Sequence, residues 1–549
     1  ETGANYSSDV NFWIVFAVFF PAVTGIEVGT SLSGDLKSPS KSIPRGTIAS
    51  ILVTAVVYVA VAIWFALHST PEQLITDKLA MQRIAAWPLL ILIGVWASTL
   101  SSALGSVLAA PRTLQALGKD SVVPTWMAAQ LGSRTEPRMA VLLTVVIAVA
   151  IIWVGDLDFV APIITMFFLN TYGMVNLVAG IEKLVGNPSF RPQFRIPWFV
   201  SLLGAVGCYA AMFLINPLAT LVAIFITYGI YFLLQQRQLK RTWGDVRSGI
   251  WFALARYAVL NLEKQRRHVK NWRPNIIVFT GQPHNREQLA QVATWLTSGR
   301  GIVTFFQLII GDVNNLAGRG LRETARKHIQ TYIEDKDVMA LAEAEVISNF
   351  KQDAVTIAQA HGMGGLEANT TLMGWSGTEA GRAMQLELTR TLALLEKSVL
   401  FLHYDETDGF GQYQTINVWW GGGGDNADLM LLLTHILRRH RVWDDANVRL
   451  IRIIDGEEGL EQTRDHLVEL LNRVRVEAEP VILVQDNKAI ATIIAEESKS
   501  ADLTLMGMML PETEQAAEYS QRLNALVESV GTVLLVKNSQ TDEDLLSTG

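Results

Sequence analysis

The sequence has a single cysteine and no excess of positive charge, and each of these absences excludes a class of protein. Its single cysteine, Cys208, can form no internal disulfide, and its place in an apolar run favours the role of a small buried hydrophobic residue. Across 549 residues, 45 Lys and Arg are outnumbered by 52 Asp and Glu, which leaves a formal net charge of -7. Because no basic stripe is left to neutralise phosphates, we expect no nucleic-acid partner.

The spacings that mark catalytic and metal centres are missing from the sequence as well. The nine histidines follow no metal-ligand pattern, since His435 and His440 are five residues apart and off a common helical face. The glycines at 421–424 follow a predicted strand but lack the spacing of a dinucleotide fingerprint and the Lys-Ser/Thr of a phosphate-binding loop. With no serine in a nucleophile elbow either, we expect a protein that is not an enzyme and has no cofactor. A nucleotide at the glycine run stays an alternative to a flexible connection.

Charge is also sparse in the first part of the chain, which contains seven long apolar runs. A helix of about 20 residues crosses a hydrocarbon core of roughly 30 Å, and each run is long enough to do so. Half of the residues (50%) are hydrophobic and the mean hydropathy is +0.26, so we predict a membrane α-helical bundle of seven transmembrane helices at 12–236. The runs are approximately 12–33, 47–68, 88–116, 138–154, 159–181, 196–214 and 216–235.

The connections between these runs differ in charge, and the difference predicts their orientation. Lys and Arg collect in alternate connections and after the last run, whereas Asp156 and Asp158 make another connection acidic. The positive-inside rule then places the C-terminal region in the cytoplasm and the start of the chain, 1–11, outside the cell membrane. That start has neither the pattern of a signal peptide nor an initiating Met, so we interpret the chain as the C-terminal portion of a longer protein.

From Gln235 onward, apolar and charged stretches alternate as they do in soluble domains. The segment 237–272 is basic and has an apolar face at helical spacing, which predicts a linker helix that packs against a partner or a membrane surface. Strands then alternate with helices through 273–549, which predicts a cytoplasmic, doubly wound α/β domain of two pseudo-repeated halves with a mainly parallel sheet. The predicted strands are 275–280, 302–310, 370–375, 398–403, 415–420, 447–453, 480–484, 502–507 and 532–537.

One apolar stretch, FFPAVTGIEVGTSLSGDL at 19–36, contains residues that a lipid-buried helix normally avoids. Pro21 removes a backbone donor, glycines permit conformations that other residues disfavour, and Glu27 adds a carboxylate. We expect the helix to break between Thr24 and Gly29, where the freed backbone groups line protein or a cavity. The broken ends would offer carbonyls to a cation and amides to an anion. The alternative is a proline-kinked helix whose glycines serve helix packing.

Further segments in both halves of the chain support a single family resemblance. SIPRGT at 42–47 follows the stretch above, and WASTLSSALGSVLAAPRTLQALGKDSVVP at 96–124 and APIITMFFLNTYGMVNL at 161–177 come later. HVKNWRPNIIVFTG at 268–281 and INVWWGGGG at 416–424 lie in the C-terminal half. In content and order these segments resemble the cation-chloride cotransporter family of the amino acid-polyamine-organocation superfamily, in its sodium-potassium-chloride-like branch and prokaryotic type.

The resemblance implies a fold and an assembly as well as a family. The membrane part would be the second half of an inverted-repeat transporter core, lacking the N-terminal half, in a lipid bilayer. The α/β domain would be a stress-protein-like regulatory domain. The linker helix and this domain would form a homodimer.

The resemblance also assigns ion-binding roles to individual residues. Carbonyl and hydroxyl oxygens are the hard ligands that alkali cations prefer, backbone amides suit an anion, and no metal beyond transported alkali cations is expected. From the residues alone, the serines could equally serve helix packing and the tyrosine could be satisfied by a nearby carbonyl. The implied ligands are Pro21 and Thr24 for potassium, Gly25, Ile26, Glu27 and Tyr172 for chloride, and Ser98, Ser101 and Ser102 for sodium.

Glu27 departs from the family pattern, which usually has an aliphatic residue at that place. An ionised carboxylate beside an anion site would repel chloride, so three arrangements are open. The side chain points away and pairs with a cation, it is protonated in a dry site, or it occupies the anion position itself. The last two arrangements would make transport depend on pH or couple it to protons.

Three functions follow as hypotheses. The leading one is a secondary active symporter that moves sodium, potassium and chloride by alternating access. The second is an amino-acid or amine permease of the same superfamily, driven by protons through Glu27 or by sodium through Ser101 and Ser102. The third belongs to another class and is a membrane-tethered regulator that senses a nucleotide with its α/β domain.

Overall fold

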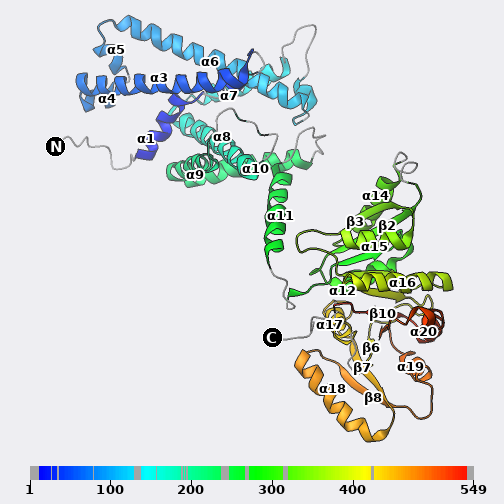
Figure 1. Ribbon diagram of the computed structural model, residues 1–549. Helices are drawn as coiled ribbons and strands as arrows, with labels where there is room; N and C mark the ends of the chain where they lie inside the picture. The colour runs from blue at the N-terminus through cyan, green and yellow to red at the C-terminus, as the bar shows by residue number, and fades with distance from the viewer. Residues whose placement is uncertain are drawn as a thin grey trace. The chain divides into compact units, whose positions relative to one another are not determined.

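Figure 1 shows a computed structural model of the chain, which divides into the units Glu1–Ala255 and Arg256–Gly549. The division falls inside the segment predicted as a linker helix, and the domain boundaries predicted from the sequence stay predictions. The structure describes residues 12–25, 28–31, 33, 36–77, 79–120, 122–128, 138–155, 157–186, 190, 192, 196–236, 246–265, 271–312, 320–421 and 426–540.

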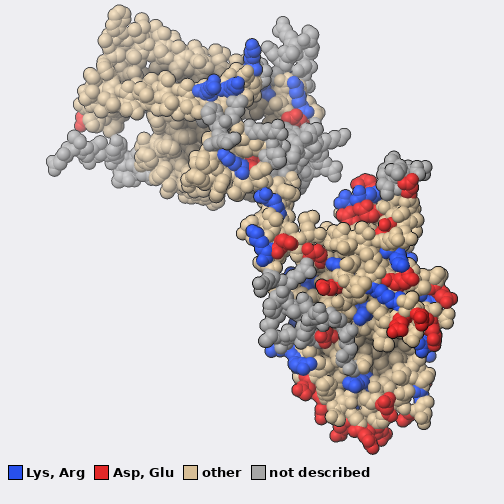
Figure 2. All heavy atoms as spheres, viewed as in Figure 1, with Lys and Arg blue, Asp and Glu red and all other residues tan. Residues whose placement is uncertain are grey.

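In the first unit, all regular secondary structure among the described residues is helical. Figure 2 shows few Lys, Arg, Asp or Glu on these helices, whereas charges of both signs are spread over the second unit. The helices are α1 (Phe12–Phe19), η1 (Phe20–Val23), α2 (Val28–Ser31), α3 (Pro39–His68), α4 (Pro71–Thr76), α5 (Ala80–Ile84), α6 (Pro88–Lys119), η3 (Thr125–Ala128), α7 (Arg138–Val154), α8 (Leu157–Val185), α9 (Trp198–Ile215) and α10 (Pro217–Gln236), and α11 (Val246–Lys264) follows them.

Four of the described helices are long and apolar enough to cross a membrane, by length and composition. They are α3, α6, α9 and the Val160–Val185 part of α8. Three shorter apolar helices lie at Phe12–Val23, Arg138–Trp153 and Pro217–Phe232. These seven segments coincide with the predicted apolar runs, and the number of them that spans a membrane stays a prediction.

Glycines bring α8 and α9 into close contact. A Cβ at Gly173 would lie 3.0 Å from the ring of Tyr209 and 3.3 Å from the Cβ of Cys208, so the two helices meet at this glycine. Gly180 and Gly204 face side chains of the opposite helix in the same way, at 2.7 and 3.0 Å. Close approach through small residues is the usual way in which membrane helices associate. Half-buried Cys208 is part of this contact, as the small hydrophobic residue that we expected.

The second unit contains one ten-stranded sheet with helices between most strands. All nine predicted strands are confirmed, and the sequence analysis missed a tenth, β3. The strands are β1 (Ile276–Phe279), β2 (Val303–Ile310), β3 (Leu341–Ile347), β4 (Thr370–Gly374), β5 (Ser398–His403), β6 (Thr415–Trp419), β7 (Asn447–Ile454), β8 (Glu479–Val484), β9 (Leu503–Gly507) and β10 (Val533–Lys537). The main helices are α12 (Glu287–Thr297), α14 (Leu321–Asp335), α15 (Phe350–Ala360), α16 (Glu379–Leu394), α17 (Ala427–Arg438), α18 (Leu460–Val474), α19 (Ile490–Ser498) and α20 (Ala516–Val530).

The strand order is β3-β2-β1-β4-β5-β10-β9-β6-β7-β8, in which the same five-strand order occurs twice. Neighbouring strands within each half are parallel. The strands β5 and β10 pair antiparallel, with Phe401 opposite Leu535, and this pair joins the halves. The predicted doubly wound domain of two pseudo-repeated halves is therefore confirmed.

Helices cover both faces of this sheet (Figure 1). One apolar cluster packs the strands against α12, α14, α17 and α18, and Phe305 and Trp443 are fully buried in it. The other packs them against α15, α16, α19 and α20 and buries Phe401. Because the strands are buried on both faces, most of them read as nearly continuous apolar runs, which is why they could be predicted.

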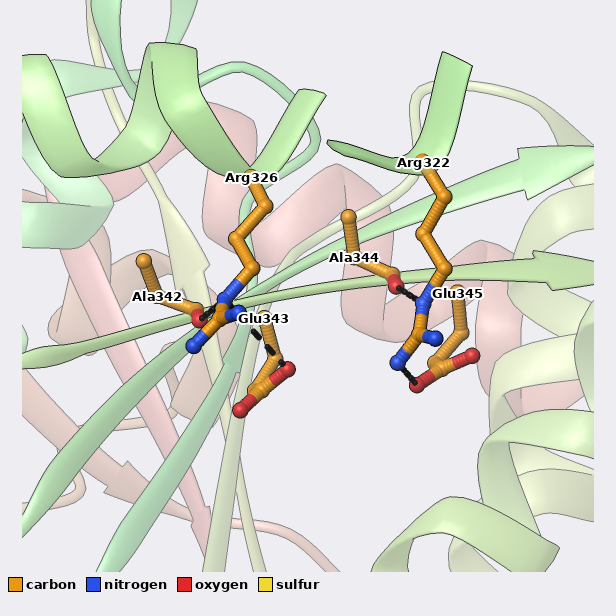
Figure 3. A network of polar contacts seen from close by, with 6 residues as sticks. All are labelled: Arg322, Arg326, Ala342, Glu343, Ala344 and Glu345. Carbon is orange, nitrogen blue, oxygen red and sulfur yellow. Dashed lines mark hydrogen bonds and ion pairs between the residues drawn. The ribbon is translucent and has the colours of Figure 1, made fainter. Parts of the chain in front are cut away.

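The outer edge of β3 is covered by side chains from α14 (Figure 3). Nε of Arg322 donates to the carbonyl of Ala344 at 2.8 Å, and Nε of Arg326 donates to the carbonyl of Ala342 at 3.1 Å. These carbonyls belong to residues two apart, so they face the same edge, and β2 occupies the other edge. Arg322 also pairs with Glu345 at 2.6 Å, which holds its guanidinium beside the strand.

Candidate functional site

The helix that begins at Phe12 is interrupted in the predicted place. α1 ends at Phe19, one 3-10 turn continues to Val23, and α2 begins at Val28. Thr24 is extended, with φ -88° and ψ 175°, and Gly25 has φ +105°, a backbone conformation that favours glycine. The predicted break in the helix is therefore confirmed.

Two oxygen atoms predicted to face a cation lie together at this break. The hydroxyl of Thr24 donates to the carbonyl oxygen of Pro21 at 2.7 Å, and the backbone N–H of Thr24 lies 3.3 Å from the same oxygen. The Thr24 side chain is half-buried. Both oxygens sit at the C-terminal end of the first half-helix, where the helix dipole is negative.

Hydroxyls from two other helices reach backbone carbonyls on either side of Pro21. Thr165 of α8 donates to the carbonyl of Ala17 at 2.6 Å. Tyr58 of α3 donates to the carbonyl of Ala22 at 2.7 Å. In an apolar environment such side chains satisfy backbone groups that a helix break leaves without their usual partners. Neither contact was predicted from the sequence.

The structure describes only some of the residues that were predicted to bind chloride. Tyr172 of α8 is half-buried, and its ring centroid lies 6.3 Å from that of Phe20, next to the break. The structure thus brings Tyr172 beside the interrupted helix. Ile26 and Glu27 lie outside the described residues.

The three serines predicted to bind sodium lie on α6, and the structure leaves Ser98, Ser101 and Ser102 exposed. In the described part of the chain, no hydrogen bond joins them to Pro21 or Thr24. Their assignment therefore still depends on the sequence resemblance.

The α/β unit contains a crevice that the sequence analysis did not identify. Its volume is about 660 Å³, and it lies at the carboxyl ends of β1 and β4, where the strand order changes direction. Such switch points are the usual ligand sites of doubly wound sheets. Its lining includes Gly281, Arg286, Ser376, Gly377 and His403, and none of the described lining residues is a carboxylate. The signal in the sequence was GWSGT, which follows a strand and precedes a helix as the glycine run at 421–424 does.

The electrostatics of this crevice favour an uncharged or anionic ligand. Arg286 provides a positive charge in the lining. Burial lowers the pKa of His403, and this outweighs the opposing effects of Glu528 and Asp405. His403 is therefore neutral near pH 7.

The corresponding strand ends in the second half are tied together by a side chain. Asn426 precedes α17, and its Nδ2 donates to the carbonyl of Met508 at 2.9 Å. Its Oδ1 accepts from the N–H of Asn538 at 2.8 Å. Of the predicted glycine run, only Gly421 is described, and 422–425 lie outside the described residues.

Solved structures resemble about half of the chain. The cytoplasmic domain of a prokaryotic cation chloride cotransporter is 16% identical, over 50% of this chain and 99% of that one, with a TM-score of 0.38. A universal stress protein from Archaeoglobus fulgidus is 13% identical, over 49% and 98% of the two chains, with a TM-score of 0.34. A putative universal stress protein from Pseudomonas aeruginosa is 12% identical, over 51% and 98%, with a TM-score of 0.33.

Two family models match the sequence itself. The amino acid permease model matches residues 2–278, just over half of the chain. The solute carrier family 12 model, that of the cation-chloride cotransporters, matches residues 403–492 in the α/β unit. The chain therefore belongs to the amino acid permease family, and its resemblance to the cation-chloride cotransporters is confirmed.

Proposed function

We propose that the protein is a secondary active symporter that moves sodium, potassium and chloride together by alternating access. The observation that supports this most is the interrupted helix, in which the carbonyl of Pro21 and the hydroxyl of Thr24 lie 2.7 Å apart. Two hard oxygens at the negative end of a half-helix suit an alkali cation, and we assign potassium to them.

We assign chloride to the other side of the same break. Backbone amides at Gly25, Ile26 and Glu27 would hold the anion together with the hydroxyl of Tyr172. The position of Tyr172 beside Phe20 supports this assignment. Sodium is assigned to Ser98, Ser101 and Ser102 on α6 on the basis of the resemblance.

A second candidate function is an amino-acid or amine permease. The family model that matches the membrane part supports it. The carboxylate of an amino acid would then bind the amides that follow Thr24, and protons would drive uptake through Glu27. The two candidates differ in whether chloride is needed for transport.

We further propose a regulatory, cytoplasmic role for the α/β unit and a homodimer formed through it and the linker helix. On α11, Trp251, Phe252 and Tyr257 are each about 70% exposed, and such aromatic side chains are typical of a surface that a partner covers. The crevice of about 660 Å³ has the size of a small-molecule site, so a nucleotide or another small anion is the ligand that we would test first.

The test of the symport proposal is ion flux into vesicles that contain the complete protein. Sodium, potassium, chloride and pH are varied separately, and uptake of a radioactive potassium analogue is measured. We expect uptake to require all three ions. Uptake without chloride would overturn the symport proposal and favour the permease.

The role of Glu27 is tested with the variant Glu27→Leu in the same vesicles. If its carboxylate couples protons, this variant loses the pH dependence of transport. A pH dependence that persists in the variant would exclude Glu27 as the proton-coupled group.

A further inference from the structure

Pro21 leaves a backbone acceptor of α1 without its usual donor. In an α-helix the carbonyl of residue 17 accepts a hydrogen bond from the N–H of residue 21. Residue 21 is proline and has no N–H. Ala17 is 1% exposed, so its carbonyl lies away from bulk water. A buried carbonyl in this position is costly unless another group supplies a hydrogen bond.

Thr165 supplies that hydrogen bond from another helix. Its hydroxyl lies 2.6 Å from the carbonyl oxygen of Ala17, and Thr165 is 0% exposed. The two residues are 148 positions apart in the sequence, so only the packing of α8 against α1 brings them together.

This hydrogen bond differs from those of other threonines in the same unit. Thr144, Thr171 and Thr227 each donate to the carbonyl four residues earlier in their own helix, which is the ordinary pattern for a threonine in a helix. Thr165 instead donates to the Ala17 carbonyl, whose i+4 donor is missing because residue 21 is proline. The Thr165 hydroxyl therefore reaches the same carbonyl that the N–H of residue 21 would bond in a regular helix.

We propose that Thr165 is a positioning residue for the helix break, because its hydroxyl replaces the N–H that Pro21 lacks. Thr165 and Tyr172 are seven residues apart on α8, two turns along the same face. The hydrogen bond therefore fixes the end of α1 relative to the helix that carries Tyr172. The effect on transport rests on the proposed function, whereas the hydrogen bond itself can be tested without it.

The test is a double-mutant cycle on the complete protein in detergent, read out as Tm. Thr165→Val removes the hydroxyl and keeps the shape, and Pro21→Ala restores a backbone N–H at position 21. We expect Thr165→Val to lower the Tm by about 2 to 4 °C when Pro21 is present. With Pro21→Ala we expect a clearly smaller loss, since the restored N–H bonds the Ala17 carbonyl.

Two further variants keep the result interpretable. Thr165→Ser retains the hydroxyl, and we expect it to lower the Tm much less than Thr165→Val does. Thr144→Val is the control, because Thr144 is half-buried and its hydroxyl donates to the Ala140 carbonyl within its own helix. An equal effect of Thr165→Val with and without Pro21 would overturn the proposal. If Pro21→Ala does not fold, the two Thr165 variants alone decide. The proposal is then overturned if Thr165→Ser lowers the Tm as much as Thr165→Val does.

The transport arm separates this inference from the symport proposal. If the unmodified protein transports ions, we expect Thr165→Val to raise the KM for the cation about threefold to tenfold while kcat changes less, and Thr165→Ser to restore the KM. An unchanged KM would overturn the positioning role in transport. If the unmodified protein moves no ions, the symport proposal fails, and the Tm cycle still decides whether Thr165 replaces the missing donor.

Discussion

The hydroxyl of Thr24 donates to the carbonyl oxygen of Pro21 at 2.7 Å, across the last turn before the helix stops. Proline ends the regular hydrogen bonding, and threonine brings a second oxygen to the same place. The two residues that the sequence analysis assigned to one cation are therefore adjacent in space.

Removing the Thr24 hydroxyl should weaken cation binding. We expect Thr24→Val to raise the KM for potassium about tenfold, which corresponds to about 1.4 kcal/mol. Uptake measured against potassium concentration in vesicles checks this, and Thr24→Ser should keep a near-normal KM because it retains the hydroxyl. An unchanged KM in Thr24→Val would remove Thr24 from the cation site.

Gly25 should tolerate a side chain poorly for reasons of backbone conformation. Its φ is +105°, although no atom of the described residues lies within 4 Å of an added Cβ. We expect Gly25→Ala to lower the free energy of unfolding by about 1 to 2 kcal/mol. Gly29→Ala is the control, because Gly29 has equally open surroundings but lies in α2 without a positive φ. Equal stability of the two variants, measured by thermal unfolding in detergent, would argue against backbone strain.

The arginines over β3 should keep this edge of the sheet from pairing with another chain. An uncovered edge strand offers unpaired backbone groups to a second strand. We expect Arg322→Ala with Arg326→Ala to increase self-association, measured by light scattering on a sizing column.

The control for this prediction is a pair of arginines with the same charge elsewhere in the unit. Arg464 and Arg473 are exposed on α18, and their replacement by Ala changes the net charge equally. If both double variants associate alike, charge rather than the uncovered edge is the cause.

Half-buried histidines should make the α/β unit less stable as the pH falls. Burial lowers the pKa of His361 below its ordinary value of 6.5, and Lys397 lowers it further. The folded state then binds fewer protons than the unfolded state, so stability is complete above about pH 6.5 and is lost as the pH falls toward the folded-state pKa. Burial also lowers the pKa values of His403, His435 and His440, so these residues contribute in the same sense.

Denaturant unfolding between pH 7.5 and 5.5 checks this prediction. We expect His361→Asn to reduce the pH dependence of stability, since it removes one of these groups. His466→Asn is the control, because His466 is exposed on α18. An unchanged pH dependence in His361→Asn would contradict the assignment.

Much of the fold could be predicted because its signals are local. Most of the nine predicted strands are apolar runs buried on both faces, and such runs are visible without knowing their partners. The missed strand, β3, reads LAEAEVI and lies at the edge of the sheet, where small and charged residues replace the apolar run. Pro21 predicted the break for a similar reason, since its missing N–H is a property of the residue itself.

The crevice was missed because it is formed by residues that the sequence keeps far apart. Gly281 follows β1 and Gly377 follows β4, and only the pairing of β1 with β4 brings these loops to one place. The glycine run at 421–424 has a similar local pattern, yet the neighbouring Asn426 ties strand ends in that half together. A pattern of strand, glycine and helix therefore did not reveal that a crevice lies at the carboxyl ends of β1 and β4.

Local sequence was enough to predict that a proline interrupts an apolar helix and that strands and helices alternate in the second unit. These features depend on covalent chemistry and on the period of apolar residues, which neighbouring positions are enough to specify. The hydrogen bond from Thr165 to the carbonyl of Ala17 and the antiparallel pairing of β5 with β10 were not predictable in this way. Both relationships join segments more than a hundred residues apart, and such contacts arise only when whole helices and strands pack.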